Sequence, residues 1–217
     1  MISHNVRMSF GLRPAAAALA VAGAVMLAGC SGGAPADPGT SPASATGSAS
    51  PSPSSTPTPT PSAVYKPADA SGPAQNVPVP VLPEVAKTET KEGAEAFTKY
   101  WFSLLSYAYE TGDTTPMSEL SVSECTFCQG LVSDIEAAWA EGKWISGGQI
   151  EIPAATAQSS SNGSFQVVLQ VLQKELEIHN QDGSPYQERT AATNAGSVAV
   201  VKFEGSKWTV NDLGLIR

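Results

Sequence analysis

The feature that most constrains the fold of this chain is an amphipathic helical pattern between Glu84 and Glu110. Apolar side chains recur there at helical intervals, which places them on one face of an α-helix while charged side chains occupy the others. That apolar face consists of Ala94, Phe97, Trp101, Leu104, Leu105 and Ala108. Such a helix must bury its face against another layer, so we expect it to nucleate the core. Thr88 or Thr90 would cap its start, and Gly112 would end it.

Two more helices are predicted after Gly112. A short one is expected from Thr115 to Leu120, with Pro116 in its first turn. A longer one is expected to open near Val122 and to run to Glu141. The reason is that Ser121 and Glu124 have the spacing of a capping box, in which each side chain satisfies a free backbone N–H at the helix start.

After Gly142 the apolar pattern changes from helical to extended. We expect strands at 144–152 with an interruption at Gly147-Gly148, at 165–178 with a bulge near Val171-Leu172, and at 186–192, 197–203 and 208–216. Residues Gly205-Ser206 between the last two suit a type II′ hairpin turn. Helices followed by antiparallel strands predict an α+β fold, in which N-terminal helices pack on one face of a curved antiparallel sheet.

Residues 1–29 have the pattern of a lipoprotein signal peptide. Arg7 and Arg13 precede an apolar run at 14–29 that is too short and too rich in Ala and Gly to be a good membrane span. The run ends in Leu-Ala-Gly-Cys30, which resembles a bacterial lipobox. We therefore expect Cys30 to carry a lipid that anchors the mature chain to the cell membrane, on its extracytoplasmic face. The alternative is a secreted protein in which Cys30 carries no lipid.

Residues 30–83 are predicted to be a disordered spacer. Ala, Ser, Thr, Gly and Pro dominate this stretch, and most of the 17 prolines lie between Pro35 and Pro83. Such a composition buries too little apolar surface to offset the entropy of ordering the chain. The more apolar residues 73–83 are expected to lie as a strap against the domain edge. The folded domain is then expected at 84–217, and whether the spacer is glycosylated stays open.

The charge of the chain excludes some partners. The formal net charge is −8, and removal of residues 1–29 takes away two arginines and no acid, so the mature chain would carry −10. Lys and Arg are scattered singly, which leaves no basic patch for a nucleic-acid backbone. We expect no nucleic-acid partner, and a solvated, acidic surface in the cell envelope.

Cys125 and Cys128 form the CxxC motif of the chain. In an extracytoplasmic compartment a structural disulfide is the preferred interpretation. A redox pair is the alternative, since a helix N-terminus lowers a thiol pKa, but helices rather than a βαβ unit precede the motif. Zinc would need two more ligands, and the mature chain has one histidine, His179, which we expect to be solvated at a strand end. We therefore expect no metal and no cofactor.

The pattern AxAFxxYWFxxLxYAYETGD at the first helix resembles the opening of nuclear transport factor 2-like (cystatin-like) domains. Together with the lipobox, the Pro/Ser spacer, the CxxC and GKWISGG, it is similar to a family of uncharacterised actinobacterial lipoproteins. The resemblance implies a cone-shaped α+β fold that can hold a pocket, and it implies no established activity.

The aromatic side chains that could line such a pocket are Trp101, Tyr107, Trp139, Trp144 and Trp208. Equally, their helical and strand spacing is that of plain core residues. Asp113, Glu119, Asp134 and Asp212 are nominal acid–base candidates, but a solvated acidic surface explains them as well. We therefore expect a non-catalytic module that binds an envelope protein or a small apolar ligand. A cone-fold isomerase or hydratase and a thiol oxidoreductase are the alternatives.

Overall fold

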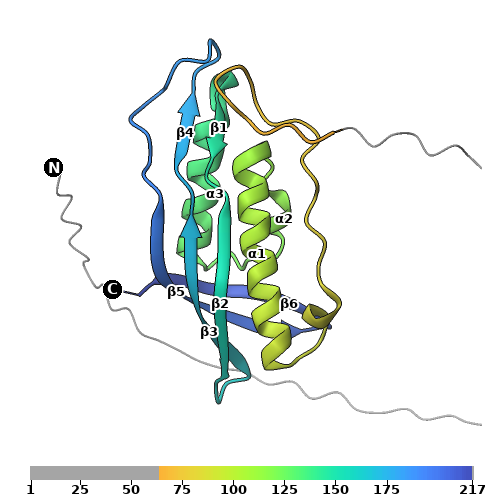
Figure 1. Ribbon diagram of the computed structural model, residues 1–217. Coiled ribbons are helices and arrows are strands. Elements are labelled where there is room, and N and C mark those ends of the chain that lie inside the picture. Colours follow the sequence, from red (N-terminus) through yellow and green to blue (C-terminus); the bar gives the residue numbers. More distant parts are fainter. Residues whose placement is uncertain (1–63, 217) are drawn as a thin grey trace, which may run out of the picture. The chain divides into compact units, whose positions relative to one another are not determined.

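The computed structural model describes residues 64–216 (Figure 1). The helical elements are η1 (Glu84–Lys87), α1 (Lys91–Thr111), α2 (Thr115–Ser118), α3 (Thr126–Trp139) and η2 (Ala140–Gly142). The strands are β1 (Trp144–Gly147), β2 (Ile150–Ser159), β3 (Ser164–Gln173), β4 (Leu176–His179), β5 (Thr193–Glu204) and β6 (Lys207–Leu215). The expected signal peptide, Cys30 and most of the expected spacer lie outside the described residues. Within residues 64–216, no helix combines the length and the apolar character that a membrane span needs.

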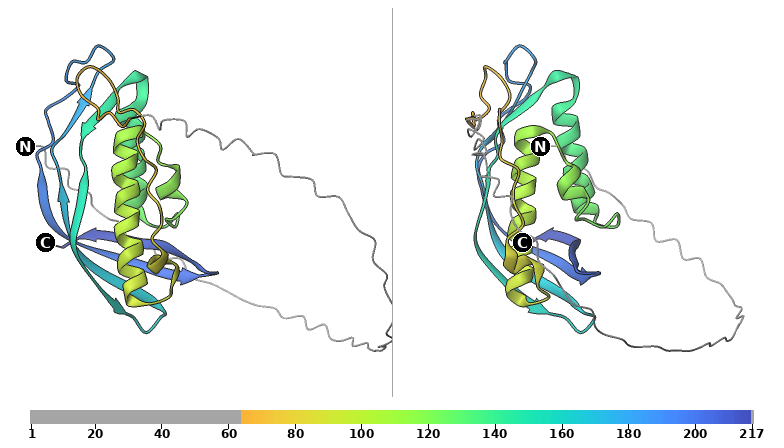
Figure 2. Two further views of the ribbon diagram at one scale, coloured as in Figure 1. Left: turned by 45° about the vertical axis from the view of Figure 1, so that its right-hand side comes forward. Right: turned by 90° about the vertical axis from the view of Figure 1, so that its right-hand side faces the viewer.

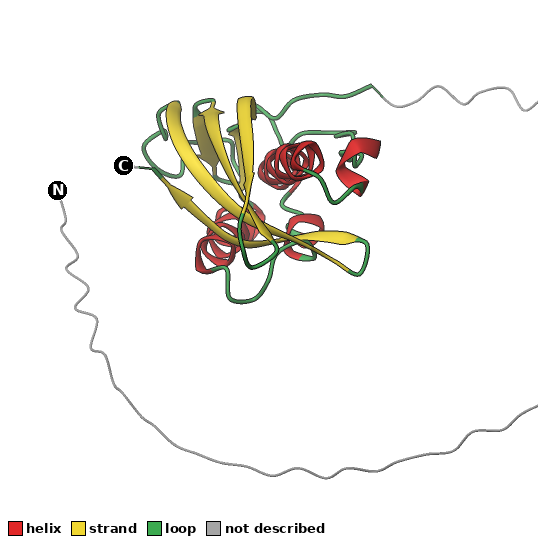
Figure 3. Ribbon diagram, turned by 90° about the horizontal axis from the view of Figure 1, so that it is seen from below, coloured by secondary structure: helices red, strands yellow, loops and turns green. Residues whose placement is uncertain are grey.

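The strands form two antiparallel ladders. A four-stranded sheet has the order β2-β3-β5-β6, and β1 pairs with β4 in a separate two-stranded ladder. Figure 2 shows that this sheet is strongly bent and that α1 runs along it. Seen from below in Figure 3, the strands curve around α1. The expected α+β fold, with helices preceding a curved antiparallel sheet on which they pack, is confirmed.

Helix α1 is the centre of the core, as its apolar pattern predicted. Phe97, Trp101, Leu104 and Leu105 are almost completely buried. The hydroxyl oxygen of Thr90 accepts a hydrogen bond from the Gly93 amide at 3.0 Å, so Thr90 is the N-cap. The prediction of one helix from Glu84 is wrong, because residues 84–87 form a separate 3₁₀ turn before the cap.

Helix α3 starts four residues later than the capping-box pattern predicted. Ser121 does not cap a helix: its hydroxyl donates to the carbonyl oxygen of Met117 at 2.8 Å, and it accepts from the indole of Trp101 at 2.9 Å. The backbone of Val122 donates to the carbonyl oxygen of Val210 on β6. Tertiary contacts therefore hold residues 121–122 extended, and Cys125 becomes the N-cap of α3.

The predicted interruption at Gly147-Gly148 is confirmed, because both glycines adopt positive φ and separate β1 from β2. A bulge near 171–172 is not observed, since β3 pairs residue for residue with β5 over its whole length. Inward-facing side chains occupy odd-numbered positions in β3 and even-numbered ones in β4 because the strand is interrupted between them. The β2–β3 register shift does lie opposite Val171, but the extra residue is on β2, between Glu151 and Ala154. A second shift lies on β6, opposite Val200 and Val201 of β5.

Residues 186–192 do not form the predicted strand. They contact β4 through single bridges, such as Leu176 with Thr190, and otherwise form a loop. The β5–β6 hairpin is present, but its turn is type I′ rather than type II′, because Gly205 and Ser206 both have positive φ, 57° and 66°.

The folded part of the chain extends N-terminally to Val64, beyond the strap expected at 73–83. In Figures 1 and 2 this segment first forms a loop beyond the ends of β1 and β4 and then runs alongside α1. The Tyr65 hydroxyl donates to Glu110 at 2.7 Å, and Leu82 packs against the core. Much of what the composition assigned to the spacer therefore belongs to the domain.

Candidate ligand cavity

A cavity of about 390 Å³ opens between α3 and the β1–β4 ladder. Its walls are mainly apolar. Its lining residues are Tyr109, Leu131, Asp134, Ile135, Ala137, Ala138, Ile145, Gln173, Leu176, Ile178, Tyr186, Gln187 and Thr190. We call this space the Tyr109 cavity. Ile145 and Ile178 are opposite each other in the ladder, so both point to one face of it, and α3 faces them with Ile135 and Ala138. The size is at the lower end of the range typical of small-molecule sites.

Tyr109 lines this cavity and is 9% exposed. Its hydroxyl makes no hydrogen bond within residues 64–216. It also keeps some contact with solvent, because the one fully buried polar side-chain atom without a partner in that part of the chain is Trp208 Nε1. Burial, with a smaller contribution from the Asp134 charge, raises the pKa of Tyr109 to about 12, so the phenol stays neutral at physiological pH.

The five aromatic residues expected to line a pocket do not line the Tyr109 cavity. Trp101 is buried beside Ser121, and Trp139 donates from Nε1 to the carbonyl oxygen of Tyr109 at 3.2 Å. Tyr107 is half-buried on α1. Trp144 is buried on the opposite face of β1 from the cavity. These side chains hold the fold together, which is the plain-core interpretation.

Trp208 belongs to an aromatic cluster at the other end of the sheet. Its ring lies 5.0 to 5.9 Å, centroid to centroid, from those of Phe97, Phe165 and Phe203. It also lines a smaller cavity of about 150 Å³ near η1. Trp208 is thus the one member of the predicted aromatic set that borders a described cavity, and that cavity is not the Tyr109 cavity.

The nominal acid candidates are all exposed. Of Asp113, Glu119, Asp134 and Asp212, one lines the Tyr109 cavity, namely Asp134. Sequence reasoning missed Tyr109 as a site residue, although it continues the buried stripe of α1 one position after Ala108. It also missed Tyr186, which lies in the loop that was expected to be a strand.

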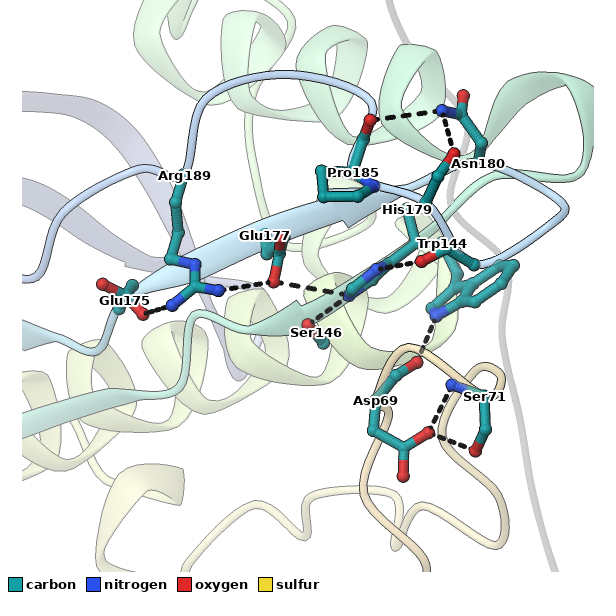
Figure 4. Close-up of polar contacts among 12 residues, drawn as sticks. Asp69, Ser71, Trp144, Ser146, Glu175, Glu177, His179, Asn180, Pro185 and Arg189 are labelled. Carbon is teal, nitrogen blue, oxygen red and sulfur yellow. Dashed lines mark hydrogen bonds and ion pairs between the residues drawn. The ribbon is translucent and has the colours of Figure 1, made fainter.

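His179 is buried rather than solvated, contrary to our expectation (Figure 4). Its ring stacks on Trp144 with centroids 5.4 Å apart, and Nε2 lies 2.7 Å from the Ser146 hydroxyl. Nδ1 lies 3.3 Å from the carbonyl oxygen of Gly183. Trp144 in turn donates from Nε1 to the carbonyl oxygen of Asp69 at 2.9 Å. The histidine therefore joins β1, β4, the loop after β4 and the N-terminal segment.

This cluster does not have the geometry of a hydrolase triad. The nearest carboxylate, Glu177, approaches the same Nε2 that faces Ser146, at 3.9 Å, instead of Nδ1. Glu177 is also engaged by Arg189, which bridges it to Glu175 (Figure 4). Neither Ser146 nor His179 lines the Tyr109 cavity. We interpret the cluster as structural.

Cys125 and Cys128 are joined by a disulfide with Cα atoms 5.3 Å apart. Both residues are completely buried, and Sγ of Cys125 accepts from the Cys128 amide at the start of α3. Thiol–disulfide exchange needs an attacking thiolate to reach a sulfur, so burial opposes a redox role. Among residues 64–216 no group of three or more His, Cys, Asp or Glu side chains is arranged to hold a metal ion.

Three solved structures that are similar to this chain have TM-scores below 0.5. The intermembrane space region of the chloroplast protein ARC6 has a TM-score of 0.43 and 9% identity, covering 58% of this chain and 96% of that one. Aln2 from a Streptomyces species has a TM-score of 0.38 and 8% identity, with coverages of 58% and 89%. An uncharacterized protein with a cystatin-like fold from Caulobacter vibrioides has a TM-score of 0.36 and 9% identity, with coverages of 56% and 89%. None of these likenesses bears on the function of this chain.

The sequence comparison with protein families is more informative. No match was found among curated proteins. The family described as "Family of unknown function (DUF6318)" matches residues 63–214, which include nearly all of the described residues 64–216. The chain therefore belongs to this family of unknown function.

Proposed function

We propose that this protein is a membrane-anchored envelope lipoprotein whose domain binds a small, mainly apolar ligand in the Tyr109 cavity. The observation that carries the proposal is the cavity itself, which has about 390 Å³, apolar walls from α3, β1 and β4, and the neutral phenol Tyr109 among its lining residues. A few directed polar groups in an apolar cavity are the usual composition of a ligand site.

The lipid anchor is supported by the sequence of residues 1–33. The charged start, the apolar run and Cys30 fall in the order that signal-peptide processing and lipidation require. Lipid anchoring would leave the domain free to meet ligands outside the membrane. Mass spectrometry of the mature protein tests this part: we expect a chain beginning at Cys30 with an added diacylglyceryl mass. A mature chain whose Cys30 carries no lipid would contradict it.

Two matched variants test the cavity. Ala137 is exposed at the cavity mouth on α3, so Ala137→Trp should obstruct the opening at little cost in stability. Ala154 is exposed on β2 and does not line the cavity, so Ala154→Trp is the control. Titration with naphthalene as a neutral apolar probe should give saturable binding that Ala137→Trp weakens and Ala154→Trp leaves unchanged. No saturable binding, or equal weakening by both variants, would contradict the proposal.

The catalytic alternatives find less support. Acid–base chemistry of the isomerase or hydratase kind needs a group whose protonation is tuned by its surroundings, and the one carboxylate at the Tyr109 cavity, Asp134, is exposed to water. Thiol oxidoreductase chemistry needs an accessible sulfur, and both sulfurs are buried. Binding is therefore the function that the geometry supports best.

A further inference from the structure

We propose that the ligand of the Tyr109 cavity is an organic cation, that is, a small molecule with an apolar body and a single ammonium or similar group. This inference rests on the function proposed above and narrows it to one chemical class.

The charge that lines the cavity is negative. Of its lining side chains, Asp134 alone is charged. A neighbouring cavity of about 500 Å³ shares Leu131 and Asp134 with it and adds Asp212, and no lysine or arginine lines either space. A ligand that extends along this side of α3 therefore meets two carboxylates and no cation among the lining residues.

Two cations close to lining residues of the Tyr109 cavity are engaged elsewhere. Lys143 lies over the ring of Tyr186, 4.4 Å from its centroid, and its Nζ is 3.8 Å from the Glu141 carboxylate. It lines a separate cavity that shares Tyr186 with the Tyr109 cavity. Arg189 follows Gln187 in the loop, but its guanidinium donates to glutamates at 2.8 and 3.2 Å. Neither cation offers an anionic ligand a free partner inside the Tyr109 cavity.

Tyr109 and Asp134 complement a cation in different ways. Within residues 64–216 the Asp134 carboxylate takes part in no ion pair, so a ligand would displace only water from it. The neutral Tyr109 hydroxyl can accept a hydrogen bond from a ligand N–H. Because Asp134 is exposed to water, its preference for a cation over an anion is the modest one of a solvent-screened ion pair.

Three probes of nearly equal shape test the charge preference on the full chain. They are 1-(aminomethyl)naphthalene, the neutral 1-(hydroxymethyl)naphthalene and the anionic naphthalene-1-carboxylate, titrated by calorimetry at low salt. We expect the amine to bind about threefold to fivefold more tightly than the alcohol, the magnitude of a partly exposed ion pair, and the carboxylate to bind most weakly. Added NaCl should reduce the advantage of the amine and leave the alcohol unaffected.

Asp134→Asn should reduce binding of the amine to the level of the alcohol without weakening the alcohol. Glu119→Gln removes one negative charge from an exposed position outside both cavities and is the control. Equal affinities for the three probes, preference for the carboxylate, or an amine preference that survives Asp134→Asn would overturn this inference while leaving the ligand site intact. If the neutral alcohol does not bind at all, the function proposed above fails as well.

Discussion

Replacement of Gly112 by alanine should lower the free energy of unfolding by more than the backbone strain of a side chain at positive φ accounts for. Gly112 ends α1 in the left-handed conformation, with φ of 76°. A side chain costs about 1 kcal/mol there, because Cβ crowds the backbone. A Cβ at this position would also lie 2.8 Å from Cδ2 of Trp139, which is closer than such atoms pack. Trp139 cannot move away freely, since its Nε1 donates to the carbonyl oxygen of Tyr109 at 3.2 Å.

Overpacking of this kind costs about 1 to 3 kcal/mol, so the expected total loss for Gly112→Ala is about 3 kcal/mol. Gly163 provides a matched control: its φ is 78°, yet a Cβ there would meet nothing within 4 Å. Gly163→Ala should therefore lose about 1 kcal/mol, the backbone cost alone. The difference of about 2 kcal/mol between the two variants isolates the contact with Trp139.

Urea unfolding of both variants, followed by tryptophan fluorescence, measures these losses, provided that the m-values stay equal to that of the parent. Trp139→Leu removes the ring that the new Cβ would contact, so it should reduce the penalty of Gly112→Ala. The double variant should therefore lose less free energy of unfolding than the two single variants lose together. Equal losses for Gly112→Ala and Gly163→Ala, or strict additivity with Trp139→Leu, would refute the reasoning.

Three further predictions concern the disulfide, the N-terminal segment and pH. Replacing both Cys125 and Cys128 by serine should lower the free energy of unfolding by about 2 kcal/mol, the entropic effect of so short a loop, and calorimetry should show the loss in the melting temperature. Trp144→Phe keeps an aromatic ring but removes the donor to Asp69 and part of the buried indole, so it should cost the roughly 1 kcal/mol of the hydrogen bond plus the lost packing. It should speed proteolysis near residue 70, with no change expected at the C-terminal hairpin. The phenol of Tyr109 should titrate near pH 12 by ultraviolet absorbance, because its folded pKa is raised to about 12 from an ordinary value of 10. The corresponding stabilisation, about 2 to 3 kcal/mol at most, is complete below pH 10 and is lost as pH rises through 12. The pKa of Tyr65 is also raised to about 12, so Tyr109→Phe should reduce this alkaline loss without abolishing it, and an unchanged loss in that variant would assign it to Tyr65 or another group.

The successes of sequence reasoning lie where local pattern and tertiary environment agree. Helix α1 shows one apolar face, a threonine cap and a terminal glycine, and each signal points to the same element. The Gly147-Gly148 interruption was predictable for the same reason, since two consecutive glycines break an extended apolar pattern, and both adopt positive φ in the structure. Local signals of this kind depend only on backbone sterics and periodicity.

The failures lie where distant contacts outweigh a local pattern. Ser121 had the spacing of a helix cap, but Trp101 and Met117 engage its hydroxyl and β6 engages its neighbour. His179 read as solvated because it precedes a turn, yet Trp144 and the loop after β4 cover it. In both cases a decisive partner is far along the sequence, namely Trp101 for Ser121 and Trp144 for His179, so no local window contains that contact.

The chain's own order of residues determined the class of fold, the buried stripe of α1, the cysteine pair and the acidic charge of the molecule. These follow from periodicity and composition, which act along the chain. Tertiary structure alone decided that residues 64–83 belong to the domain, that the tryptophans are core, and that Tyr109 and Asp134 meet at one cavity. Those outcomes depend on which surfaces come together when α3 closes over the β1–β4 ladder, because burial and charge proximity are properties of the packed molecule.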